Sequence, residues 1–323
     1  MTGGIEAVAE AIKHLDSVLV STHISPEGDA IGSELGLALS LIKMGKKVSI
    51  LNADPVPEFL RFLPGAELIK TGTEIPEQYD ALVVVDCEPE RTGLKLKDAP
   101  GLRTINIDHH ITNPRTASVF WINPEAAAAG EMVYDLLTFM NAPIDRDIAT
   151  NLYTCIFTDT GSFRYANTDA DALAKSAKLL SYGVETWKIA ENVYETKSFG
   201  RMKLLGLVLA NMEISLDGLV AWVTVKEEFY RMTGTKSEDT DGFINYPRAV
   251  KGVEVAVLFR EAGPDKVKIS FRSKGRVNVS TLAENLGGGG HPNASGVVMG
   301  MSLEKTRDFV LPRVMEHMKL FSA

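Results

Sequence analysis

Short apolar runs rich in β-branched residues alternate with helical patterns in the first half of the chain. The runs cover residues 17–20, 47–51, 81–85 and 104–107. Runs without polar alternation are typical of strands that are buried on both faces. Helical patterns lie between the first two runs, near residues 31–42, and later near residues 126–140 and 145–158. Because a helix that joins two strands makes them parallel, we expect an α/β domain with a doubly wound, mainly parallel sheet.

The second half of the chain has a different layout. An amphipathic stretch without proline, residues 184–211, predicts a helical connector instead of a flexible linker. New strand-like runs and a last helical pattern follow it, at residues 219–225, 253–259 and 267–271 and around Pro312. These elements predict a smaller α/β domain. We therefore expect a first domain over residues 1–186, a helical linker over 187–212 and a second domain over 213–323.

The composition predicts a cytoplasmic protein. No stretch approaches the roughly 18 uninterrupted apolar residues of a membrane span, and the first residues lack the basic-then-apolar layout of a signal peptide. Cys87 and Cys155 each lie inside an apolar run, which is typical of reduced core thiols and fits a reducing compartment. We expect no contact with a membrane.

The charge distribution limits the class of ligand. The formal net charge of −8 argues against a broad basic face that coats long duplex nucleic acid. Between Ile244 and Gly296, however, eight basic residues accompany four acidic ones, so this segment carries a net charge of +4. A small ligand with phosphate groups, held locally, fits this distribution better than a polymer held along its length.

Polar side chains cluster directly after the first predicted strand. His23, Glu27 and Asp29 lie in a short turn before a helix. Nitrogen and oxygen donors of this kind suit Mn²⁺, Mg²⁺ or Zn²⁺. The alternative is that the two acids cap the helix, because helix starts often carry acids.

Two further clusters follow the third and fourth predicted strands. The third strand ends at Asp86, and the fourth ends in Asp108, His109 and His110. Because ligands of open α/β sheets bind outside the carboxyl ends of the strands, we expect these side chains to meet the first cluster at one edge. Asp159 ends a helical apolar run and is either a further ligand or an ordinary turn residue.

The remaining histidines separate into two kinds. His291 belongs to a glycine-rich segment, whereas His14 and His317 lie in helical patterns, where we expect solvated or packing side chains. The segment contains Gly288, Gly289 and Gly290, whose backbone N–H groups can approach an anion closely.

Arg272 lies on a predicted strand just before this segment, where its guanidinium could clamp a phosphate. The alternatives are a flexible surface turn for the glycines and a solvated edge-strand residue for the arginine.

These motifs resemble those of a known superfamily. Four motifs resemble, in the same order, those of the DHH phosphoesterase superfamily. They are His-x-x-x-Glu-x-Asp, a lone Asp after the third strand, Asp-His-His and Thr-Asp-Thr-Gly. The segment from Gly287 to Gly296 resembles the signature of the DHH-associated domain. Within the superfamily, the chain is most similar to the group of nanoRNases and 3'-phosphoadenosine 5'-phosphate phosphatases.

The resemblance implies a hydrolase that uses two divalent metal ions, Mn²⁺ or else Mg²⁺ or Co²⁺. It implies that one ion is held by His23, Glu27 and Asp86, and the second by Asp29, Asp86, His109 and Asp159. It also implies catalytic roles for Asp108, His109 and His110, and substrate binding by Arg272, Gly288, Gly289, Gly290 and His291. One departure is that Glu27 stands where the family usually has Asp.

The implied substrates are short oligoribonucleotides, 3'-phosphoadenosine 5'-phosphate or both. We expect no binding of long duplex nucleic acid, and a homodimer is compatible with the sequence. The alternatives are a phosphodiesterase for cyclic or linear dinucleotides, an inorganic pyrophosphatase and a catalytically weak nucleotide-binding sensor. The glycine-rich segment argues against the pyrophosphatase, and Glu27 is the only hint of the sensor.

Overall fold

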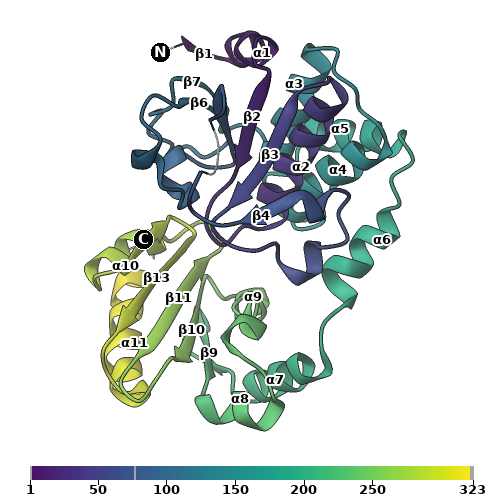
Figure 1. Ribbon diagram of the computed structural model, residues 1–323. Coiled ribbons are helices and arrows are strands. Elements are labelled where there is room, and N and C mark those ends of the chain that lie inside the picture. Colours follow the sequence, from purple (N-terminus) through teal and green to yellow (C-terminus); the bar gives the residue numbers. More distant parts are fainter. Residues whose placement is uncertain (1, 76–77, 321–323) are drawn as a thin grey trace. The chain divides into compact units, whose positions relative to one another are not determined.

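The computed structural model describes residues 2–75 and 78–320 of the 323-residue chain. The chain divides into two compact units, Met1–Thr196 and Lys197–Ala323 (Figure 1). This division falls inside the segment 187–212, for which we expected a linker. The three-part layout therefore remains a prediction, and each unit is described by itself.

The first unit contains a sheet of seven parallel strands in the order β1-β7-β6-β5-β2-β3-β4. The strands are β1 Thr2–Gly3, β2 Ser17–Ser21, β3 Lys47–Asn52, β4 Ile69–Thr71, β5 Ala81–Val85, β6 Arg103–Asp108 and β7 Val119–Ile122. The predicted α/β class and parallel sheet are thereby confirmed. The four predicted strands appear as β2, β3, β5 and β6, whereas β1, β4 and β7 were not predicted because they are only two to four residues long.

Helices cover one face of this sheet and pack in its main core. They are α1 Ile5–Lys13, α2 Gly28–Lys43, α3 Ala129–Phe139, α4 Arg146–Asp159, α5 Ala170–Leu180 and α6 Thr186–Ala190, which a π-helical turn, Glu191–Glu195, extends. Val18 and Val20 of β2 face this core. Leu19 between them faces the other side, where Leu94, between two short 3-10 turns, and Leu96, in the second turn, cover the sheet. This alternation is the two-residue repeat of a buried strand.

The order of the strands creates a switch point in the first sheet. From β2 the chain adds β3 and β4 on one side, and then β5, β6 and β7 on the other. The carboxyl ends of β2, β5 and β6 therefore lie next to one another. Crevices at such a point are the usual ligand sites of open α/β sheets.

The second unit is a mixed sheet with helices on both faces. Its strands, in the order β12-β13-β11-β10-β9-β8, are β8 Glu213–Ile214, β9 Val220–Val225, β10 Val255–Glu261, β11 Val267–Ser273, β12 Gly289–His291 and β13 Ala294–Met299. Its helices are α7 Phe199–Ala210, α8 Glu227–Thr233, α9 Asn245–Ala249, α10 Val279–Asn285 and α11 Leu303–Lys319. Val257 of β10 packs with α10 and α11, whereas its neighbour Leu258 packs with α7 and α8. Pro312 lies inside α11.

The structure bears on two further predictions, which concern membrane spans and the cysteines. Within residues 2–75 and 78–320, every helix is too short or too polar to cross a membrane. Cys87 and Cys155 are both buried and both free thiols, as expected of core cysteines.

Three glycines allow α2 and α4 to pack unusually closely. Gly28, Gly32 and Gly36 recur every fourth residue, so they line one face of α2. A Cβ atom at Gly32 would lie 2.5 Å from Cys155 Sγ and 2.6 Å from the Asn151 carbonyl oxygen. This close packing was not predicted from the sequence. Close packing here is what brings the end of α4 to the start of α2.

We expect Gly32→Ala to destabilise the protein by about 1–3 kcal/mol, because the added methyl group forces the two helices apart. The matched control is Gly206→Ala in α7, where no atom lies within 4 Å of the added Cβ. Helix propensity alone should make this control neutral or more stable by up to about 1 kcal/mol. Chemical unfolding of both variants measures the difference, and equal stabilities would contradict the close-packing account.

Candidate metal centre

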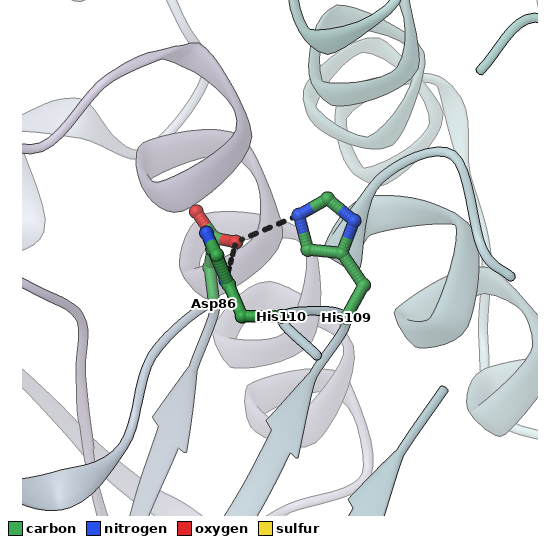
Figure 2. Close-up of side chains that lie close together, drawn as sticks. All are labelled: Asp86, His109 and His110. Atoms are coloured by element: carbon green, nitrogen blue, oxygen red, sulfur yellow. Dashed lines mark ion pairs between the residues drawn. The ribbon is translucent and has the colours of Figure 1, made fainter. Parts of the chain in front are cut away.

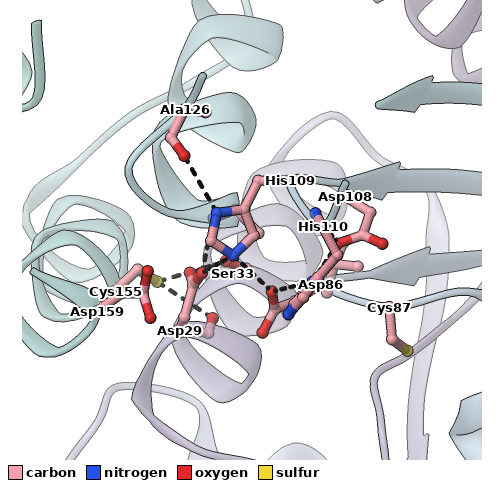
Figure 3. Close-up of polar contacts among 12 residues, drawn as sticks. Asp29, Ser33, Asp86, Cys87, Asp108, His109, His110, Ala126, Cys155 and Asp159 are labelled. Carbon is pink, nitrogen blue, oxygen red and sulfur yellow. Dashed lines mark hydrogen bonds and ion pairs between the residues drawn. The ribbon is translucent and has the colours of Figure 1, made fainter. Parts of the chain in front are cut away.

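The ends of three neighbouring strands supply the side chains of the site. His23 lies just beyond β2, Asp86 directly follows β5, and β6 ends at Asp108, before His109 and His110. Since β5 pairs with both β2 and β6 in parallel, these ends meet at one edge of the sheet. Figures 2 and 3 show the imidazoles of His109 and His110 next to the Asp86 carboxylate.

Asp86 occupies the centre of the group. It is 1% exposed, and neither carboxylate oxygen has a partner at ordinary hydrogen-bond distance within residues 2–75 and 78–320. Imidazole nitrogens surround it: His109 Nε2 lies 3.3 Å from Oδ1, His23 Nε2 3.5 Å from Oδ2 and His110 Nδ1 3.7 Å from Oδ1. Its backbone is left-handed, with φ of 63°. That conformation costs an ordinary residue about 1 kcal/mol and is characteristic of functional sites.

Backbone carbonyl groups orient two of the imidazoles. His23 Nδ1 donates to the Ile24 carbonyl oxygen at 2.8 Å, and His109 Nδ1 donates to that of Ala126 at 3.1 Å. A carbonyl oxygen only accepts hydrogen bonds, so each Nδ1 carries a hydrogen. The Nε2 atom of each ring is thereby turned toward the carboxylates, which is the usual arrangement of metal-bound histidines.

Asp29 lies in the first turn of α2 and is 1% exposed. Its carboxylate accepts hydrogen bonds from the backbone N–H groups of Ala129 and Gly130, at 2.7 and 2.9 Å, and from the Ser33 hydroxyl at 3.0 Å. Its Oδ2 atom also lies 3.6 Å from His109 Nε2. Asp29 is therefore held between the start of α3 and the strand ends.

The side chains form three overlapping groups, within each of which one ligand atom per residue lies within 4.8 Å of the others. The groups are His23, Glu27 and Asp86; Asp29, His109 and Asp159; and Asp86, His109 and His110. The longer side chain of Glu27 thus still reaches the site. Asp159, at the end of α4, also joins it. Their roles as ligands remain predictions.

Burial and mutual charge shift the pKa values of the acids. Burial, together with the charge of Asp86, raises the pKa of Asp29 to about 6, and burial with the charge of Asp29 raises the pKa of Asp159 to about 8. Burial opposes ionisation of Asp86 as well, but His109 and His23 outweigh it and hold its pKa below the usual value. The acids therefore compete for the available positive charge.

The same two effects shift the pKa values of the histidines, but burial acts on them with the opposite sign. Burial alone would lower their pKa values, but Asp86 and its neighbours raise the pKa of His23 to about 9 and that of His109 to about 11. Protons on the imidazoles thus balance part of the negative charge. A divalent cation can replace those protons, since metal ligation requires neutral imidazoles.

The distances also fit a cation. Charged nitrogen–oxygen hydrogen bonds are about 2.7–2.9 Å long, whereas His109 Nε2 and His23 Nε2 lie 3.3 and 3.5 Å from the Asp86 oxygens. Two atoms that each bind one ion at about 2.0–2.2 Å lie roughly 3.0–3.5 Å apart. Since the Asp86 oxygens also accept no hydrogen bond from the described residues, this spacing makes the cluster a candidate site for divalent metal ions.

Asp108 lies beneath the cluster and belongs to none of the three groups. It is fully buried, and its Oδ1 atom accepts hydrogen bonds from the His110 backbone N–H at 3.0 Å and from His110 Nδ1 at 2.7 Å. The Asn113 side chain donates to its other oxygen. Asp108 raises the pKa of His110, whose side chain is 26% exposed. Asp108 therefore orients His110, whose side chain remains partly exposed to solvent.

Segment 126–130, which was not predicted as part of the site, contacts it through backbone atoms. Its carbonyl and N–H groups hold His109 and Asp29. All five residues are small, four alanines followed by Gly130, and all are buried. A run of small residues before a helix is the signal that could have identified a close backbone approach.

In the second unit the strand register aligns Arg272 with His291. Arg272 on β11 pairs with Ala294 on β13, which pairs with His291 on β12. Directly opposite residues of antiparallel strands project from the same face, so the two side chains share one face of the sheet. We call these two residues the basic row.

The expected glycine-rich loop is partly a strand in the structure. Gly289–His291 forms the edge strand β12, paired with β13. A Cβ atom at Gly288 would lie 2.2 Å from the Gly296 carbonyl oxygen, and Gly290 has φ of 142°. Close packing of this hairpin is thus one physical reason for the glycines, whether or not they also bind an anion.

The two remaining histidines lie outside both regions. His14 is exposed and pairs with Glu10, whereas His317 is buried in α11, with Nε2 2.9 Å from the Asn278 carbonyl oxygen. The expectation of solvated or packing histidines is confirmed.

Glu34 provides a test of the electrostatics near the site. Burial raises its pKa to about 8; its Oε1 accepts from Asn52 at 2.6 Å, whereas its Oε2 has no hydrogen-bond partner within the described residues. Because the pKa of Glu34 is raised in the folded protein, its protonated form stabilises the fold. This contribution to stability is complete below the pKa of the unfolded chain, about 4.5, and is lost as pH rises toward 8. In metal-free protein we expect Glu34→Gln to gain stability over the native chain between about pH 5 and 8, on the order of 1 kcal/mol per pH unit. Urea unfolding at several pH values measures this, and parallel curves for the two proteins would contradict it.

Comparison with known proteins agrees with this geometry. The model of the DHH family, N-terminal domain, matches residues 17–156, and that of the DHHA1 domain matches residues 219–311. The chain belongs to the DHH family.

Its relatives include bifunctional enzymes. It is 37% identical to the bifunctional oligoribonuclease and PAP phosphatase NrnA of Thermus thermophilus over 96% of this chain and 93% of that protein. The protein of the same name from Bacillus subtilis is 27% identical over 87% of this chain and 88% of its own length. An exopolyphosphatase-related protein from Bacteroides fragilis has a similar structure, with a TM-score of 0.92, 28% identity and coverage of 99% of this chain and 97% of that one.

Proposed function

We propose that the chain is a cytoplasmic phosphoesterase that uses two divalent metal ions, Mn²⁺ foremost, to hydrolyse short oligoribonucleotides, 3'-phosphoadenosine 5'-phosphate or both. The observation that carries the proposal is the overlap of the ligand groups at Asp86 and His109. The names of the NrnA relatives support the substrate class. Mixed imidazole and carboxylate donors suit Mn²⁺ better than Mg²⁺, which prefers oxygen alone.

Asp86 connects the two proposed ion positions. Its Oδ2 atom faces His23, in the group with Glu27, and its Oδ1 atom faces His109, in the group with Asp29 and Asp159. Two divalent cations, when bound, lower the pKa of water and offset the negative charge of a phosphoryl group. The protein fixes the carboxylates and imidazoles that such ions require, so little rearrangement is needed on binding.

His110 is the candidate proton donor. Its Nδ1 donates to Asp108, which places Nε2 as the ring atom that can give a proton to a leaving oxygen. Asp108 raises the pKa of His110 and so favours its protonated form. Neither residue needs to form a covalent bond to the substrate.

The basic row, Arg272 and His291, is the candidate phosphate-binding element of the second unit. Both residues lie within the segment of net charge +4 between Ile244 and Gly296. An arginine fork and an imidazole on one face of a sheet can bind a terminal phosphate. A local site of this kind favours short substrates over long ones.

The proposal predicts Mn²⁺-dependent hydrolysis. With 5'-phosphorylated dinucleotides to 20-mers, 3'-phosphoadenosine 5'-phosphate, a cyclic dinucleotide and pyrophosphate as substrates, we expect the shortest RNAs or the adenosine bisphosphate to react fastest. Product analysis by chromatography gives the rates. Fastest cleavage of the 20-mer, or preference for the cyclic dinucleotide, would contradict this assignment. Tight nucleotide binding without turnover would instead support a sensor.

Asp86→Asn should lower the rate on the preferred substrate on the order of 10³-fold, because the loss of a shared ligand removes several kcal/mol of charge stabilisation. The control is Asp98→Asn, an exposed carboxylate outside the three groups, which should leave the rate unchanged. A similar rate for Asp86→Asn and the native protein would exclude the proposed centre.

A further inference from the structure

Lys175 of α5 is held by three carboxylates at the edge of the first unit's core. Its Nζ atom lies 2.8 Å from Glu131 and 2.6 Å from Asp135, both on α3, and 2.6 Å from Asp171 on its own helix. The side chain of Lys175 is 13% exposed and that of Glu131 is 4% exposed. Burial of this kind is rare for lysine and glutamate and requires a partner. Lys175 on α5 therefore restrains the side chain of Glu131 on α3.

Glu131 continues the contacts toward the metal centre. Its second carboxylate oxygen, Oε2, accepts a hydrogen bond from the Ala127 backbone N–H at 3.1 Å. The carbonyl oxygen of Ala126 accepts one from His109 Nδ1, also at 3.1 Å. These two backbone groups belong to the same peptide unit. Glu131 and His109 thus bind opposite ends of a single dipole.

The electrostatics of this arrangement favour one orientation of His109. A carboxylate that accepts from the N–H group polarises the peptide, so that its carbonyl oxygen becomes a stronger acceptor. This polarisation would strengthen the hydrogen bond from Nδ1, in the orientation in which Nε2 lies 3.3 and 3.6 Å from Asp86 and Asp29. Figure 3 shows the ring of His109 between Ala126 on one side and these carboxylates on the other.

The same backbone segment also holds the other members of one ligand group. The N–H groups of Ala129 and Gly130 bind the Asp29 carboxylate. Asn167 Nδ2 donates to the Ala127 carbonyl oxygen at 3.0 Å and lies 3.3 Å from Asp159 Oδ2. Segment 126–130 therefore contacts Asp29 and His109 directly, and it is linked to Asp159 through Asn167. The contacts of His23 described above lie elsewhere, at Ile24 and Asp86.

We propose that Glu131 and Lys175 are positioning residues for the metal ion bound by Asp29, His109 and Asp159, acting through the peptide unit of Ala126 and Ala127. The proposal rests on the metal centre proposed above. It goes beyond helix capping, in which a glutamate in the first turn reaches back to a backbone N–H. Capping alone predicts that Glu131 stabilises the fold, but it predicts no selective effect on the affinity for one ion.

Two variants remove the charges at either end of the pair. Glu131→Gln keeps an acceptor for the Ala127 N–H but loses the negative charge, and Lys175→Met removes the ammonium group that holds Glu131. The matched control is Asp135→Asn, which removes another partner of Lys175 without a contact to the Ala126–Ala127 peptide unit. Thermal unfolding of the metal-free proteins shows how far each variant affects folding.

Calorimetric titration of metal-free protein with Mn²⁺ gives the affinities of the two ions separately. We expect both variants to lower the affinity for one of the two ions about 10-fold, which is in the range known for residues that support metal ligands. The affinity for the other ion should be unchanged. Asp135→Asn should bind both ions with affinities within about 2-fold of those of the native protein. The loss should persist in a Glu27→Gln background, because Glu27 belongs to the other group.

The possible failures are distinguishable. If the native protein binds two ions and Glu131→Gln binds both with native affinity, or weakens both equally, the positioning role is wrong while the metal centre stands. If the native protein binds no Mn²⁺, the proposed function itself fails. A variant that lowers only the unfolding temperature identifies Glu131 as a helix cap.

Discussion

The structure depends on the burial of Asp86 as a charged group among imidazoles. A buried carboxylate without ordinary hydrogen bonds is costly, and its left-handed backbone adds strain. Protonated His23 and His109 offset this cost without a metal, as their raised pKa values indicate. Nitrogen–oxygen distances of 3.3–3.7 Å leave the compensation incomplete. The centre is thus a candidate site for cations that come from outside the protein.

Three features of the fold bring the required groups to Asp86. The parallel pairing of β2, β5 and β6 places His23 and His109 at the same edge of the sheet. The glycine face of α2 lets α4 approach, so that Asp159 at its end comes near Asp29. The small residues of segment 126–130 let backbone groups reach the carboxylate and the imidazole directly. Loss of any one of these would leave a buried charge without its neighbours.

Much of this was predictable from the sequence, for physical reasons. Continuous apolar runs identified β2, β3, β5 and β6, and acids or histidines beyond such runs indicated a site at one edge. The short strands β1, β4 and β7 carry too few residues for a pattern. Segment 126–130 contributes only backbone atoms, and Lys175 resembles a solvated helix residue until its burial is known. The row of Arg272 and His291 depends on a register that tertiary structure alone reveals.

Anomalous X-ray diffraction from crystals grown with Mn²⁺ tests the central claim most directly. The account predicts two peaks flanking the Asp86 carboxylate, one within bonding distance of His23 and Glu27 and the other of Asp29, His109 and Asp159. A single peak, or peaks remote from Asp86, would contradict it.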